Sequence, residues 1–186
     1  MFILMQNIMD KCIKLFVICG TQKFPFSRLV KALNGLVEQG ICLPSEIVMQ
    51  SQTNHVTPLF ETYALLSVAE FEHHLSEAEV VVTHAGVNSI ITCMRMQKPL
   101  LIVPRQKAYG EHVDNHQVEI AKLMEDKFGV TVDYDLSHFL QSIETAKEKR
   151  YKPWVSYRAG LLDAIRRDLD SFFKTTKNNI PNICHI

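Results

Sequence analysis

The sequence lacks the features that mark several large classes of protein. Its cysteines are odd in number, scattered and without C-x-x-C spacing, which argues against a disulfide framework and against a zinc knuckle. No H-E-x-x-H pair and no G-x-S-x-G elbow occur, so zinc-peptidase and serine-hydrolase chemistry have no support. Because thiols persist in a reducing compartment, we expect a cytoplasmic protein.

Long hydrophobic runs and an excess of one charge are also missing. The apolar start, Met1 to Met9, is interrupted by Gln6 and Asn7 and is shorter than the roughly 20 residues of a membrane span. The 20 basic and 20 acidic residues balance, and 47% of the chain is hydrophobic. We therefore expect an ordinary globule of one domain over residues 1–186, with its core at about 14–150, and no nucleic acid partner.

Short apolar strands that alternate with amphipathic helices dominate the chain. The patterns predict strands at Ile13–Cys19, Glu46–Gln50, Ala64–Val68, Val80–Thr83, Pro99–Val103 and Val130–Tyr134. They predict helices after Ser27, over 69–78, 87–96 and 112–128, after Ser137, and over about 157–173 within a C-terminal segment 155–174. Six such units predict an α/β fold with a doubly wound, Rossmann-like parallel sheet, whose ligands bind outside the carboxyl ends of the strands.

The stretch from Val80 to Ile90 predicts a strand, a tight turn and a helix. Gly86 would let the backbone approach a ligand closely, and His84 would face the same crevice from the strand's carboxyl end. The helix N-terminus would present the free backbone N–H groups of Val87, Asn88 and Ser89. These groups favour an anion, most naturally a diphosphate. The same pattern also fits an ordinary buried turn whose histidine caps a helix.

Two further polar groups are predicted at this edge. Gly20-Thr21 follows the first strand, and the run GEHVDNHQ, residues 110–117, precedes a helical pattern. Asp114 and Gln117 are three apart, so we expect them to share a helix side, where a carboxylate and an amide suit sugar hydroxyls. His112 and His116 are four apart, but no third metal ligand is evident, and we expect no metal and no other cofactor.

These motifs resemble a known family when they are taken in order. HAGVNS, Lys98-Pro99, the strand LLIVPR and GEHVDNHQ look like the C-terminal, donor-binding domain of glycosyltransferase family 28, which is half of a GT-B fold. The start FVICGTQKFPFSRLVKAL is similar too, so the likeness covers about residues 14 to 150. It is greatest to stand-alone members: the small catalytic subunit of the dolichol-linked N-acetylglucosaminyltransferase and the PssE-type exopolysaccharide and capsule subunits.

The resemblance implies a role for each matching residue. The nucleotide diphosphate would be held by His84, Gly86, Val87, Asn88 and Ser89, while Gly20 and Thr21 would line the cleft. Asp114 and Gln117 would reach the donor sugar, and Arg105 would help the helix N-terminus to stabilise the departing UDP. Many relatives bind ribose through a glutamate where this chain has Thr92, which is a departure from the pattern.

The resemblance also implies an activity and a partner. It predicts metal-free, inverting transfer from a UDP-sugar, with the base on the acceptor side in two-domain relatives and His84 and His116 as the candidates in this chain. A membrane-anchored partner subunit would supply the acceptor domain, hold this chain at the inner membrane face and bring a lipid-linked glycan acceptor. The last helix and the apolar start would be available for docking, although the helix fits simple packing equally well.

The preferred product is an exopolysaccharide or capsule repeat unit, because GEHVDNHQ and Thr92 look more like the bacterial subunits. Two alternatives stay open at this point. The chain could be a nucleotide-sugar-binding module that regulates a partner without transferring sugar, or an unrelated flavodoxin-like binding domain.

Overall fold

The chain folds around one parallel sheet. The computed structural model describes residues 13–52 and 54–152, so the predicted helix at 157–173 and the apolar start at 1–12 lie outside the described residues. The six strands are hydrogen-bonded in the order β3-β2-β1-β4-β5-β6, and every pairing is parallel. This order confirms the predicted doubly wound α/β class.

The elements follow the predicted alternation. The strands are β1 (Leu15–Ile18), β2 (Ile47–Gln50), β3 (Glu61–Tyr63), β4 (Val80–Thr83), β5 (Leu100–Ile102) and β6 (Thr131–Val132). The helices are α2 (Ser27–Glu38), α3 (Val68–Glu77), α4 (Val87–Arg95), α5 (His116–Phe128) and α6 (Phe139–Glu148), with short 3-10 turns at η1 (Pro44–Glu46) and η2 (Lys107–Tyr109). None of the described helices is both long enough and apolar enough to span a membrane.

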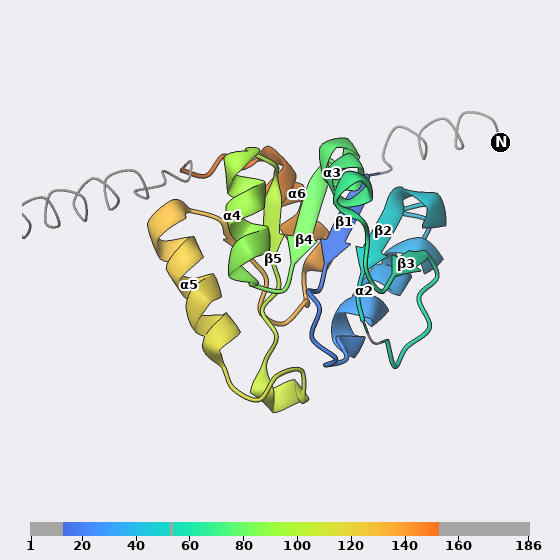
Figure 1. Ribbon diagram of the computed structural model, residues 1–186, viewed down its shortest axis with the longest axis horizontal. Helices are drawn as coiled ribbons and strands as arrows, with labels where there is room; N and C mark the ends of the chain where they lie inside the picture. Colours follow the sequence, from blue (N-terminus) through green and yellow to red (C-terminus); the bar gives the residue numbers. More distant parts are fainter. Residues whose placement is uncertain (1–12, 53, 153–186) are drawn as a thin grey trace, which may run out of the picture. The chain divides into compact units, whose positions relative to one another are not determined.

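Helices cover both faces of the sheet. In Figure 1, α3 and α4 lie in front of the strands, whereas α2 and α6 lie behind them. Side chains alternate accordingly: Leu15 and Val17 of β1 join the buried cluster with α2 and α6, while the Phe16 ring packs edge-on against Phe71 of α3 at 5.2 Å. Because β1 is buried on both faces, its sequence is a continuous apolar run.

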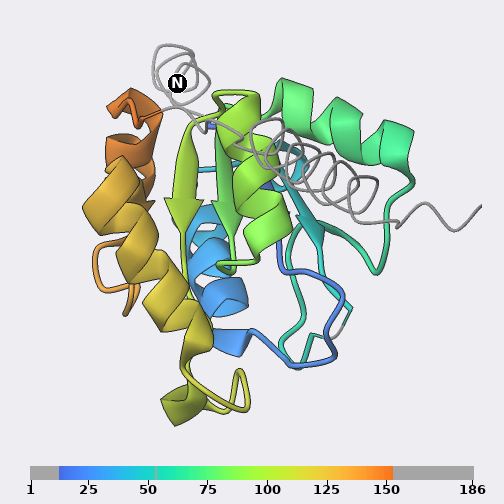
Figure 2. The same cartoon turned by 60° about the vertical axis from the view of Figure 1, so that its left-hand side comes forward.

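The order of the strands reverses between β1 and β4. These two strands are neighbours, with Ile18 opposite Thr83 at their carboxyl ends, although 61 residues separate β1 from β4. The chain leaves β1 toward α2 and leaves β4 toward α4, on opposite faces of the sheet, so a crevice opens between the two loops. Figure 2 shows the strand arrows pointing to the edge where these loops gather.

The predicted third strand at Ala64–Val68 is wrong. The strand is Glu61–Tyr63, and Leu65 and Val68 are mostly exposed. Ser67 begins α3 with a capping box instead: its Oγ accepts from the Glu70 N–H at 3.3 Å, and the Glu70 carboxylate accepts from the Ser67 N–H at 2.8 Å. The spacing S-x-x-E was the signal for this helix start, and the apolar residues around it obscured the signal.

Two helices begin later than predicted. The α5 helix starts at His116, not at 112, because the Asp114 carboxylate accepts the His116 N–H at 3.1 Å and holds the preceding residues in a turn. The α6 helix starts at Phe139, and Ser137 donates its hydroxyl to Asp135 in the turn before it.

Candidate functional site

A cleft of about 550 Å³ lies at the carboxyl ends of β1 and β4. Most of the residues nominated from the sequence line it: Gly20, Thr21, His84, Gly86, Val87, Asn88, Ser89, His116 and Gln117. Its volume is in the range of small-molecule sites, and it lies where ligands bind in doubly wound sheets. Three segments that are distant in sequence thus meet at one candidate site.

The His84 imidazole is packed between two glycines. A Cβ atom on Gly86 would lie 2.5 Å from His84 Cε1, and one on Gly20 would lie 2.7 Å from His84 Nε2. Gly20 also has a φ of +71°, which L side chains rarely adopt. The packing of the His84 ring therefore already requires glycine at both positions. The approach of a ligand would be a second reason for them.

The proton position on His84 is set by the strand beside it. Its Nδ1 lies 3.0 Å from the carbonyl oxygen of Ile18, so Nδ1 carries the hydrogen and Nε2 is left as an acceptor. Burial lowers the pKa of His84 to about 4, the Ile18 hydrogen bond opposing this shift in part. The ring is therefore neutral at physiological pH and is a weak proton acceptor.

The start of α4 supplies the hydrogen-bond donors of the cleft. The first intrahelical bond runs from the Ile90 N–H to the Gly86 carbonyl, and no side chain caps this end. Among the described residues no acceptor is found for the N–H groups of Val87, Asn88 and Ser89, all of which line the cleft. They add the positive end of the helix dipole, which favours an anionic ligand.

The structure does not bring Arg105 into the cleft. Its side chain is only 1% exposed, and its guanidinium donates to the carbonyl oxygens of Phe24 at 2.7 Å and Cys19 at 3.1 Å. Burial lowers its pKa, and its charge lies 4.7 Å from the centre of the Phe26 ring. Arg105 is absent from the lining of the cleft, and its Nη1 and Nη2 groups donate to carbonyl oxygens, while its buried Nε finds no acceptor among the described residues. This placement contradicts the expectation that Arg105 touches the departing diphosphate. It ties the loop that carries Gly20 to the end of β5.

Asp114 and Gln117 do not share a helix side. Asp114 precedes α5 and does not line the cleft, whereas Gln117 does, with its Oε1 accepting the Arg105 backbone N–H at 3.1 Å. Thr92 is absent from the lining as well, and its hydroxyl donates to the Asn88 carbonyl at 2.8 Å within α4. Of these three, only Gln117 is placed to reach a ligand directly.

Sequence reasoning missed several lining residues. They are Ile18, Gln22, Gln50, Phe71, Ala85, His112 and Ile120. Gln50 could have been found, because it is the last residue of β2 and therefore lies at the carboxyl edge. His112 was weighed only as a metal ligand. In residues 13–52 and 54–152, no group of three or more His, Cys, Asp or Glu side chains could hold a metal ion.

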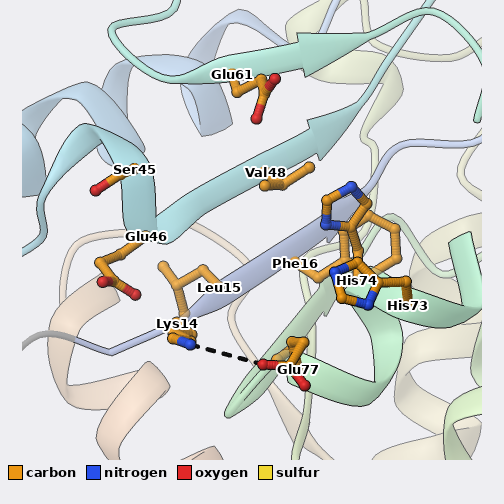
Figure 3. Close-up of a pocket in the computed structure, with 11 residues that line it drawn as sticks. Lys14, Leu15, Phe16, Ser45, Glu46, Val48, Glu61, His73, His74 and Glu77 are labelled. Atoms are coloured by element: carbon orange, nitrogen blue, oxygen red, sulfur yellow. Dashed lines mark ion pairs between the residues drawn. The ribbon is translucent and has the colours of Figure 1, made fainter. Parts of the chain in front are cut away.

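A second hollow, of about 320 Å³, opens at the opposite edge of the sheet (Figure 3). The strand residues that border it are Leu15, Phe16, Val48 and Glu61, and a Lys14–Glu77 ion pair of 3.7 Å spans part of its rim. Doubly wound sheets bind ligands at the carboxyl ends of their strands, not the amino ends. The first cleft is therefore the candidate site.

Comparisons with known proteins agree on one family. Residues 14–152 match the glycosyltransferase family 28 C-terminal domain. The "UDP-N-acetylglucosamine transferase subunit ALG13" of Yarrowia lipolytica is 26% identical over 126 residues, which cover 63% of this chain and 62% of that protein. The "UDP-N-acetylglucosamine--N-acetylmuramyl-(pentapeptide) pyrophosphoryl-undecaprenol N-acetylglucosamine transferase" of Rickettsia akari is 30% identical over 128 residues, 63% of this chain and 32% of that protein.

The match thus spans less than two thirds of either relative. Among solved structures, an NMR solution structure of ALG13 superposes with a TM-score of 0.49 and 17% sequence identity, covering 84% of this chain and 96% of that one.

Proposed function

The chain belongs to the family of the glycosyltransferase family 28 C-terminal domain, and from that membership we propose that it binds a UDP-sugar and transfers the sugar with inversion. The observation that carries the proposal is the cleft at the reversal of strand order. There the three free N–H groups at the start of α4 face the same space as Gly20 and His84. This arrangement suits a diphosphate, which helix N-termini bind without a metal.

The donor that we propose is UDP-N-acetylglucosamine. Both the fungal and the bacterial relatives are named as transferases of N-acetylglucosamine. The diphosphate would lie against Val87, Asn88 and Ser89, and the sugar would extend toward Gln117 on α5. The helix dipole then stabilises the negative charge that develops on the departing UDP.

We further propose that a second, membrane-anchored subunit completes the site and brings the acceptor. Apolar side chains lie exposed where the loops follow the carboxyl ends of the strands: Leu65 is 67% exposed, Val68 75% and Val113 63%. Exposed apolar side chains of this kind are what a partner subunit would cover. The Yarrowia lipolytica relative is itself named as a subunit. This chain would then act as a cytoplasmic protein held at the membrane by its partner.

The acceptor that we propose is a lipid-linked glycan, and the product an exopolysaccharide or capsule repeat unit. The motif GEHVDNHQ and Thr92 support the bacterial type of subunit by resemblance. Purified enzyme offered undecaprenyl-linked and dolichyl-linked acceptors side by side tests this choice. Faster transfer to the dolichyl acceptor would instead favour a role in N-glycan synthesis.

Calorimetric titration of the chain with UDP tests the donor site. We expect a dissociation constant between about 1 μM and 1 mM, which corresponds to about −8 to −4 kcal/mol. The Asn88→Ala/Ser89→Ala double variant should bind at least about tenfold more weakly, because it loses two polar side chains at the start of α4. The matched control is Ser76→Ala, an exposed serine of α3 outside the cleft.

Equal affinities of the double variant and Ser76→Ala would contradict the assignment of the diphosphate to α4. Sugar transfer by the chain together with its partner separates an enzyme from a binding module. A regulatory module would bind UDP with the same dependence on Asn88 and Ser89, and yet its loss would leave the partner's own transfer chemistry intact.

A further inference from the structure

His112 and Asp114 form a coupled pair at the cleft. His112 Nδ1 lies 2.8 Å from Asp114 Oδ1, and the His112 side chain is 12% exposed while that of Asp114 is 57% exposed. The imidazole lines the cleft and packs against the Phe24 ring, with the ring centres 5.5 Å apart. Asp114 stands outside the lining, so its carboxylate reaches the cleft only through the histidine.

The hydrogen bond decides which nitrogen of His112 is available. An ionised carboxylate can only accept, so Nδ1 must carry the hydrogen and Nε2 is left with a lone pair. Hydrogen bonds with the Asp114 carboxylate hold the pKa of that group below its ordinary value, the largest coming from the His116 backbone N–H. The Asp114 backbone N–H also approaches His112 Nδ1, but at 3.4 Å this is the weaker contact. His112 therefore presents an acceptor.

The other two histidines of the cleft are less suited to this role. The Nε2 atom of His84 is pressed between Gly20 and Gly86, and no carboxylate supports its ring. The His116 side chain is 66% exposed and lies 3.7 Å from Glu119 along the same helix. Of the three, only His112 both lines the cleft and lies within hydrogen-bond distance of a carboxylate, at 2.8 Å against 3.7 Å for His116.

We propose that His112 accepts a hydrogen bond from a substrate hydroxyl through Nε2, and that Asp114 is the positioning residue that fixes its ring. The proposal rests on the sugar-transfer function proposed above. An imidazole nitrogen with a lone pair accepts a hydrogen bond from a hydroxyl but not from a phosphate, which has no proton to donate at neutral pH. The hydroxyl belongs either to the donor sugar or to the acceptor.

The two sources give different chemistry. On the donor sugar, the hydrogen bond positions the ring and contributes to sugar specificity. On the acceptor, it becomes a proton transfer: the O–H bond breaks as the oxygen bonds to the anomeric carbon, and the proton passes to Nε2. The bond from the anomeric carbon to the diphosphate oxygen breaks with its electron pair, and UDP leaves. Asp114 would stabilise the positive charge on the imidazole.

The surrounding charges bear on this proton transfer. Burial, and to a smaller extent the charge of Arg105, lowers the pKa of His84 at the end of β4, so this ring is neutral. His116 from α5 interacts with Asp114 from the other side. Glu111 is paired with Arg28. Asp114 is thus the carboxylate that directly contacts the His112 ring.

The test compares the full chain with His112→Phe, which keeps an aromatic ring against Phe24 but has no acceptor. If the hydroxyl is on the donor, the variant binds UDP-N-acetylglucosamine about 3- to 10-fold more weakly, the loss expected for one hydrogen bond, while its affinity for UDP is unchanged. If the hydroxyl is on the acceptor, both affinities are unchanged, and kcat with the partner falls.

Asp114 supplies the matched pair of variants. Asp114→Asn keeps an oxygen that can accept from His112 Nδ1 and from the His116 N–H, so it should retain most of the wild-type donor affinity if the hydroxyl is on the donor. If the hydroxyl is on the acceptor, its kcat should fall, because a neutral amide does not stabilise the positive charge on the imidazole. Asp114→Ala has no side-chain oxygen for either hydrogen bond, and it should show the same losses as His112→Phe. If His112 and Asp114 had only a structural role, His112→Phe, Asp114→Asn and Asp114→Ala would all have a lower melting temperature. They would also bind UDP and UDP-N-acetylglucosamine more weakly by the same factor.

Either pattern supports the proposal, and wild-type donor affinity together with wild-type kcat in His112→Phe overturns it. Nitrogen NMR of the full chain decides the ring chemistry independently of any partner, because a hydrogen on Nε2 of His112 at pH 8 also overturns it. If the wild-type chain did not bind UDP at all, the proposed function would be refuted instead. The two failures can therefore be told apart.

Discussion

Arg28 and Glu111, 83 residues apart in sequence, form an ion pair that joins α2 to the loop before α5. Arg28 Nε donates to both carboxylate oxygens, at 2.8 and 3.0 Å, and the Glu111 side chain is only 4% exposed. Glu111 also accepts the Gln106 N–H at 3.1 Å. The pair therefore holds the segment that carries His112 against the helix that follows the Gly20 loop.

Replacing Glu111 should destabilise the fold. In Glu111→Ala, Arg28 keeps carbonyl acceptors on Pro104 and Tyr134 but loses its carboxylate, so we expect a loss of about 2–4 kcal/mol in the free energy of unfolding. Urea denaturation measures it. The control is Asp126→Ala, which removes the exposed Lys122 pair and should change stability by less than about 0.5 kcal/mol. Equal effects would show that burial of the Glu111 pair is unimportant.

The two glycines beside His84 should not tolerate a side chain. Gly86→Ala places a Cβ 2.5 Å from the imidazole, so we expect a loss of about 1–3 kcal/mol and weaker UDP binding as the ring is displaced. Gly20→Ala adds the strain of a positive φ. Gly35→Ala is the control, because its nearest neighbour is 3.6 Å away and alanine favours a helix interior. Denaturation and calorimetry should therefore separate the two sites from Gly35.

The sequence predicted the sheet and the cleft well because both rest on local patterns. A buried parallel strand is a continuous apolar run, and the turn after Thr83 needs small residues whatever the rest of the chain does. The failure at Ala64–Val68 has the opposite cause. There an apolar run coincided with a capping box, and the hydrogen bonds of Ser67 and Glu70 prevailed because Leu65 and Val68 have no core to enter.

Roles that depend on distant partners could not be predicted. In the sequence, Arg105 looks like a cation beside a phosphate site. Only the fold shows that its guanidinium donates hydrogen bonds to carbonyl oxygens about 80 residues earlier in the chain. His112 is similar. The sequence shows it two residues from Asp114, but its position on the cleft depends on the Phe24 ring and on the late start of α5.

Arg105 should act on ligand binding without touching the ligand. In Arg105→Met the carbonyls of Cys19, Phe24 and Pro25 lose a charged donor, so we expect a loss of about 2–4 kcal/mol in stability. The loosened Gly20 loop should also weaken UDP binding several-fold. Arg150→Met, at an exposed position near the end of α6, is the control. Wild-type stability with weakened UDP binding would mean that Arg105 contacts the ligand after all.

The low pKa of His84 predicts how stability depends on pH. The folded ring stays neutral down to about pH 4, whereas in the unfolded chain it takes a proton near its ordinary value of 6.5. Between these values the unfolded state binds more protons than the folded state. The stability that the neutral His84 ring contributes is therefore complete above pH 6.5 and is lost as the pH falls toward 4. Its full size is on the order of 3 kcal/mol.

Urea denaturation of the wild type and of His84→Gln between pH 7 and pH 4.5 measures this contribution. The stability of the wild type should fall more steeply than that of the variant over this interval, because glutamine takes up no proton. Gly35→Ala should keep the wild-type slope, since it leaves the ring and the Ile18 carbonyl in place. Parallel curves for the wild type and His84→Gln would mean that the ring protonates in the folded chain as readily as in the unfolded one. In that case the packing between Gly20 and Gly86 would not hold the imidazole neutral.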